Sequence, residues 1–145
     1  MSAVIENHDH DHHGPQKGIL RWLFTTNHKD IGTLYLWFSF LMFLTGGAMA
    51  MGIRAELFEP GLQLMDPIRY NQLVTMHGLI MIFGAVMPAF VGLANWLIPM
   101  QIGAPDMALP RMNNLSFWLL PSAFIILLST AFMAVSYTHL TLPTN

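Results

Sequence analysis

The chain has 145 residues, of which 54% are hydrophobic and only 10% are charged. A soluble domain averages about 25% charged residues, so the composition excludes an ordinary soluble domain and indicates a membrane protein. The net charge of −2 comes without a basic patch, and we therefore expect no nucleic-acid partner. Cysteine is absent, which excludes a disulfide framework and a thiolate metal site.

The N-terminal segment is polar and rich in histidine and acidic residues, so it is not a secretory signal peptide. Residues 1–16 are predicted to form a disordered tail. The run "HDHDHH" (8–13) can capture copper or zinc, or it simply keeps a mobile tail solvated. The next stretch, "GILRWLFTTNHKDIG", is amphipathic and suits the membrane interface. Asn27 or Thr26 is expected to cap the helix that follows.

Long stretches without charged residues predict three transmembrane helices. A span needs roughly 20 apolar residues to cross about 30 Å of hydrocarbon. The segments that qualify are about 33–53, 73–99 and 115–134. Pro60-Gly61 and Asp66-Pro67 mark turns in the first loop, and three prolines stiffen the second. The expected fold is an all-α membrane protein, and three such helices can bury only a small interface, as in a piece of a larger bundle.

The distribution of basic residues predicts the orientation of the chain. Lys17, Arg21 and Lys29 precede the first span, and this flank is the most basic one. The positive-inside rule therefore places the N-terminus in the cytoplasm. With three spans, Arg54 and the start of the second span then lie toward the outer face, whereas Asp106 lies at the inner face.

His77 is an unusual residue, because it lies near the start of a long uncharged run. An ionisable group inside a span is costly and usually faces the protein interior. One interpretation is structural, with the ring hydrogen-bonded to a neighbouring helix. The other is ligation of a metal, above all haem iron. At about 3.6 residues per turn, the residues that share its side of the helix are Gly84, Pro88, Gly92 and Asn95. They are small or polar, and such a face suits a porphyrin edge and close helix packing equally well.

Two charged residues at the span ends also allow two interpretations each. Arg54 ends the first span, where it can extend to the interface or contact a polar substituent of a cofactor. Asp106, in "IGAPDM", lies near Asn95 and Asn113 in the predicted topology. It is either an ordinary loop carboxylate or an acid that collects protons at the membrane surface.

Several motifs together resemble subunit I of the haem-copper cytochrome c oxidases of the aa3 type. They are "LFTTNHKDIGTLYL", "IRAEL", "VTMHGLIMIF" and "NWLIPMQIGAPDMALPRMNNLSFWLLP". The resemblance implies a bundle of about twelve transmembrane helices with a low-spin haem, a high-spin haem and a copper ion. It implies that His77 is an axial ligand of the low-spin haem a and that Arg54 contacts that haem's formyl group. Asp106, Asn95 and Asn113 match the proton pathway that begins at an aspartate.

The resemblance further implies reduction of oxygen to water, coupled to proton pumping, with electrons from cytochrome c. Subunits II and III are the implied protein partners, in a bacterial plasma membrane. Glu56 and Gly61 match positions of a peripheral calcium or sodium site. A quinol oxidase of the same superfamily and a non-redox transporter, in which His77 packs or relays protons, remain alternative interpretations.

The resemblance covers residues 17–133 and stops near Ala134, where "AVSYTHLTLPTN" replaces the glycine-rich stretch of the family. Residues 134–145 are therefore expected to be an artefactual segment, and His139 is assigned no role. The second axial histidine, the ligands of the high-spin haem and of copper B, and the other proton route lie downstream in the family. The fragment alone is not expected to catalyse the reaction.

Overall fold

The structure, a computed structural model, describes residues 18–61 and 63–132. A short helix, α1 (Ile19–Phe24), precedes the long helix α2 (His28–Glu56). A second long rod consists of α3 (Pro67–Leu79), the π-helical segment η1 (Ile80–Val86) and α4 (Met87–Ile102). The last helix is α5 (Pro110–Phe132). The predicted histidine-rich tail, the artefactual segment and His139 lie outside the described residues.

The structure thus contains three long helical rods, which are α2, the continuous rod α3–η1–α4, and α5. Each rod is long and apolar enough to cross a membrane, which confirms the three predicted spans. They cover His28–Glu56, Pro67–Ile102 and Pro110–Thr130. The helices begin before the uncharged runs that predicted them, at residues that are favoured at helix starts. Asn27 caps α2 by accepting a bond of 3.0 Å from the Lys29 amide. Pro67 begins α3 at the position where a proline costs no helical bond.

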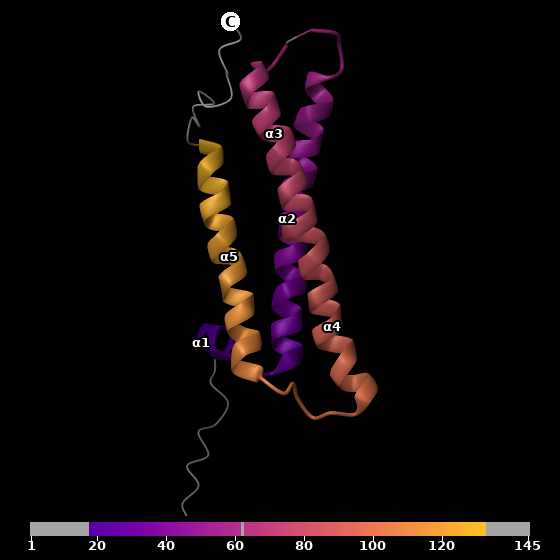
Figure 1. Cartoon of the computed structure of the whole chain (residues 1–145), viewed down its shortest axis with the longest axis vertical. Coiled ribbons are helices and arrows are strands. Elements are labelled where there is room, and N and C mark those ends of the chain that lie inside the picture. Colours follow the sequence, from indigo (N-terminus) through magenta and orange to yellow (C-terminus); the bar gives the residue numbers. More distant parts are fainter. Residues whose placement is uncertain (1–17, 62, 133–145) are drawn as a thin grey trace, which may run out of the picture.

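Successive rods run antiparallel (Figure 1): near α1, α2 lies between α5 and α4, whereas at the opposite end α3 lies between α5 and α2. Helix α2 packs along α3, η1 and α4, and more sparsely along α5. One end of the bundle holds α1, the start of α2 and the loop 103–109, and we call it the Asp106 end. The opposite end holds the end of α2, the loop 57–66 and the start of α3, and we call it the Arg54 end. The buried core joins all three rods: Ile31, Tyr35, Phe38, Ile80, Phe117 and Phe124.

Segment η1 has a local cause in the sequence. Pro88 has no amide hydrogen, and a proline ring clashes with the carbonyl four residues before it. The wider turns of η1 directly precede this proline, and the Met87 amide bonds to the Ile82 carbonyl, five residues back. Ser39 of α2 donates to the Ala85 carbonyl at 2.6 Å and so gives this irregular backbone a buried partner.

Candidate functional site

The His77 ring is held by the backbone of the neighbouring helix. His77 is half-buried in α3, and its Nδ1 lies 2.9 Å from the carbonyl oxygen of Gly46 in α2. A carbonyl oxygen only accepts, so Nδ1 carries the proton. In a neutral imidazole this leaves the lone pair on Nε2, which is the form that metal-ligating histidines take. The side chain therefore fits the role of a haem ligand oriented by a backbone carbonyl.

Gly46 allows this approach because a larger residue has no room there. A methyl group on Gly46 would lie 2.6 Å from Sδ of Met81 in η1, far inside contact distance. Two helices can approach this closely only through small residues. Gly46 thus brings α2 near enough for its carbonyl to meet His77.

The small residues that follow His77 serve helix packing. A methyl group on Gly84 would lie 2.9 Å from Cε1 of Phe124. One on Gly92 would lie 3.0 Å from the carbonyl oxygen of Gly32. The buried stripe of this rod starts at Met76 and includes Gly84 and Gly92, whereas His77 lies at its edge. These contacts account for the small residues without a porphyrin edge, so they favour the packing interpretation of that pattern.

Arg54 lies at the Arg54 end, in the last turn of α2, and is exposed. It follows Gly46 by eight residues, which corresponds to about 12 Å along the helix axis. Its assigned contact with a haem substituent stays a prediction.

Glu56 has a different environment from that of an open metal ligand. Only 3% of the residue is exposed. One carboxylate oxygen accepts from the amide of Gln63 at 2.9 Å, and the other accepts from the amides of Leu64 and Met65 at 2.8 and 3.0 Å. Glu56 therefore fastens the loop 57–66 to the end of α2.

The predicted calcium or sodium site at Glu56 and Gly61 stays a prediction. Gly61 lies in the same loop, with a φ of 111° that favours glycine. Within residues 18–61 and 63–132, no three His, Asp or Glu side chains gather closely enough to hold a metal ion. Glu56 ends α2, and Gly61 lies in the loop that Glu56 holds by hydrogen bonds to backbone amides.

The two asparagines of the predicted proton pathway meet directly. Nδ2 of Asn113 in α5 donates to Oδ1 of Asn95 in α4 at 2.7 Å. Asn95 is buried, with 4% exposed, and its own Nδ2 donates to the Val91 carbonyl at 3.0 Å. A pair of amides thus bridges two helices, and because each amide both donates and accepts, such a pair can also bind water.

Asp106 does not bond to either asparagine within the described chain. Its Oδ1 accepts from the Met107 amide at 2.8 Å and lies 3.2 Å from Nδ1 of His28. The aspartate side chain is 41% exposed and the histidine side chain only 7%. His28 was not among the residues that the sequence singled out. A histidine beside the capping Asn27 is the only signal that points to it, and the partner across 78 residues is set by the fold.

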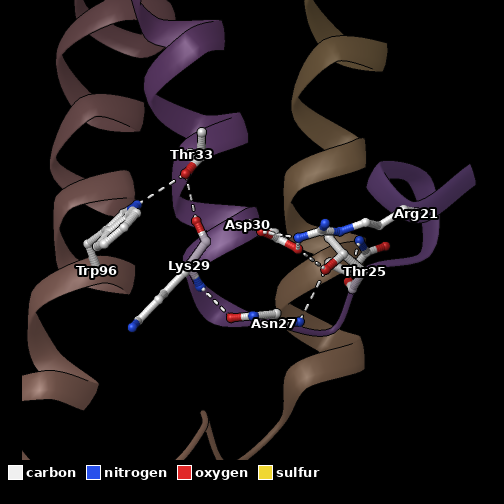
Figure 2. A network of polar contacts seen from close by, with 8 residues as sticks. Arg21, Thr25, Asn27, Lys29, Asp30, Thr33 and Trp96 are labelled. Carbon is white, nitrogen blue, oxygen red and sulfur yellow. Dashed lines mark hydrogen bonds and ion pairs between the residues drawn. The ribbon is translucent and has the colours of Figure 1, made fainter. Parts of the chain in front are cut away.

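Further polar contacts tie the Asp106 end together (Figure 2). Arg21 of α1 donates to both oxygens of Asp30 in α2, at 3.2 and 3.0 Å. Trp96 of α4 donates to the hydroxyl of Thr33 at 3.2 Å. On the α5 side, Asn114 and Trp118 donate to the backbone around α1, to the carbonyls of Thr25 and Leu23. Hydrogen bonds from polar side chains at this end thus connect α1 and all three rods to one another.

Comparison with known proteins shows which family the chain resembles. The model of the family "Cytochrome C and Quinol oxidase polypeptide I" matches residues 30–143. A Streptomyces coelicolor protein, "Probable cytochrome c oxidase subunit 1-alpha", is 52% identical over 105 residues, which cover 72% of this chain and 18% of the relative. "Cytochrome c oxidase subunit 1" of Corynebacterium diphtheriae is 46% identical over 118 residues, 80% of this chain and 21% of the relative.

The chain thus spans about a fifth of the length of the curated relatives it matches (18% and 21% of two of them). The family match runs to residue 143, beyond Ala134, and the prediction of a non-family segment there stays a prediction. Because the match covers most of the sequence and the helices agree with it, the chain belongs to the family of subunit I of the cytochrome c and quinol oxidases.

Proposed function

We propose that this chain is the N-terminal part of the catalytic subunit of a proton-pumping terminal oxidase. The complete enzyme takes electrons from cytochrome c and reduces oxygen to water. Membership of the family and the names of the relatives support this function. The relatives' names favour cytochrome c over quinol as the donor. A high-spin haem, copper B and subunits II and III belong to the proposed complete enzyme.

The bond between His77 and Gly46 is the single observation that carries the proposal. It selects the Nδ1–H form of the imidazole and leaves Nε2 as a ligand for iron. A haem held there would supply one-electron transfer. His77 binds the iron, the Gly46 carbonyl orients the ring, and Arg54 pairs with a polar substituent of the same haem a.

The Asp106 end is the proposed inlet for protons. Asp106 is an exposed acid, and the pair formed by the buried Asn95 and the half-buried Asn113 begins a polar route between the helices. With the N-terminus in the cytoplasm, this end faces the cytoplasm, from which pumped protons are drawn. Orientation and pathway were inferred from separate features, namely the lysines and arginines on the one hand and the resemblance of "GAPDM" on the other.

Replacement of His77 in the full-length oxidase tests this function against the transporter alternative. In His77→Ala we expect loss of the visible band of the low-spin haem and of oxygen consumption with reduced cytochrome c. Thr75→Ala is the matched control, since Thr75 is exposed on the same helix and, among the residues that the structure describes, bonds only to its own helix backbone, at Asn71. An unchanged haem spectrum in His77→Ala, together with altered solute transport, would overturn the proposal.

A further inference from the structure

The contact between His28 and Asp106 links the loop 103–109 to the start of α2. His28 is the first residue of α2. Only 7% of its side chain is exposed, whereas the partner carboxylate is 41% exposed. The 3.2 Å contact with Nδ1 therefore joins the surface carboxylate of Asp106 to the buried imidazole ring of His28. Because Oδ1 also accepts from the Met107 amide, the position of the carboxylate is determined from two sides.

The other ring nitrogen of His28 has no partner among the described residues. Nε2 is buried and makes no hydrogen bond there. Leaving a buried polar nitrogen unpaired is costly. Buried water commonly satisfies such an atom. Whatever the tautomer of the ring, Nε2 either accepts a hydrogen bond or donates one, so a water molecule suits both forms.

The surrounding helices place His28 close to the contact between α2 and Asn95 of α4. The two nitrogens of an imidazole lie on different sides of the ring, so Nε2 is directed away from Asp106. One helical turn after His28, at Gly32, α2 contacts α4. A methyl group on Gly32 would lie 3.2 Å from Cβ of Asn95. His28 and Gly32 are four residues apart and share a helix face, so His28 lies one helical turn nearer the Asp106 end than the contact between Gly32 and Asn95.

We propose that His28 is a positioning residue for proton uptake: Nδ1 holds the Asp106 carboxylate, and Nε2 binds a water molecule that leads toward Asn95 and Asn113. This inference rests on the proposed role of Asp106. The histidine contacts an exposed acid and lies one helical turn from the Asn95 contact, whereas the acid itself makes no hydrogen bond with Asn95 or Asn113 in the described chain.

Three variants of the full-length oxidase separate the two roles of the ring. His28→Asn keeps an amide near the position of Nδ1, and His28→Gln keeps one near the position of Nε2, whereas His28→Leu keeps neither. The readout is the rate of proton uptake during a single turnover, measured with a pH-indicator dye. We expect about tenfold slower uptake in His28→Leu and intermediate rates in the two amide variants. Arg21→Ala, which removes a polar contact at the same end, is the matched control and keeps the parent rate.

A cycle with Asp106→Asn tests whether His28 acts through Asp106. If it does, adding His28→Leu to Asp106→Asn slows uptake no further, whereas a purely structural effect would multiply the two losses. Haem spectra report assembly, and the amide variants carry the test if His28→Leu does not assemble. Parent rates in all three His28 variants, with slow uptake in Asp106→Asn, would overturn this inference alone. Parent rates in Asp106→Asn would instead overturn the proposed proton inlet.

Discussion

Gly32 is the position where a single methyl group should disturb the contact between α2 and α4 most. A Cβ there would lie 2.7 Å from Cδ1 of Trp96 and 2.9 Å from the carbonyl oxygen of Gly92. The second obstacle is backbone, so a rotamer change cannot relieve it. Overpacking of this kind costs about 1–3 kcal/mol, and the gain in helix propensity from glycine to alanine returns about 1 kcal/mol. Net of that gain, we expect Gly32→Ala to destabilise the contact by up to about 2 kcal/mol, and by about 1–3 kcal/mol relative to a glycine-to-alanine change that meets no obstacle.

Gly47→Ala is the matched control, because a methyl group added at Gly47, on the same helix, would meet no atom within 4 Å. The assay is amide hydrogen exchange of residues 92–96 in the full-length oxidase. A difference of about 1–3 kcal/mol between the two variants corresponds to exchange faster by about 5- to 150-fold in Gly32→Ala. Protection in Gly32→Ala equal to that in Gly47→Ala would refute the close packing on which the position of Asn95 depends.

Two more substitutions test contacts at opposite ends of the bundle. Glu56→Gln removes a carboxylate that accepts three backbone amides, so exchange of the amides of 63–65 should become faster by a factor that corresponds to about 1–3 kcal/mol. Glu59→Gln, an exposed neighbour, should leave it unchanged, and equal exchange in both variants would contradict the fastened loop. Asn113→Ala removes the 2.7 Å donor to the buried Oδ1 of Asn95, so proton uptake should slow, and an unaltered uptake rate would argue against a path through this pair.

The helices were predictable from the sequence because a segment that crosses lipid must be long and nearly free of charged residues. A span cannot hold many charges, so the uncharged runs locate the three rods, and the Asn27 cap follows from its side-chain chemistry. Segment η1 was not predicted. Pro88 is visible in the sequence, but whether a proline kinks, ends or widens a helix depends on the partner that Ser39 supplies from another rod.

The candidate site was predictable residue by residue but not contact by contact. His77 stands out as an ionisable residue in a span, yet its partner is a backbone carbonyl at Gly46, which no sequence pattern marks. The pair Asn95–Asn113 was placed at one end by topology, and the structure adds the direct bond. His28 was missed, because its contact with Asp106 exists only after α3, η1 and α4 have returned the chain, at the loop 103–109, to the start of α2.

Ligand rescue tests most directly whether His77 binds the haem iron. The measurement is the visible and low-temperature magnetic resonance spectrum of the low-spin haem in full-length His77→Gly, recorded before and after addition of imidazole. We expect loss of the low-spin signal in the variant and its return when free imidazole occupies the vacated position. A low-spin haem signal of full intensity in His77→Gly without imidazole would contradict ligation by His77.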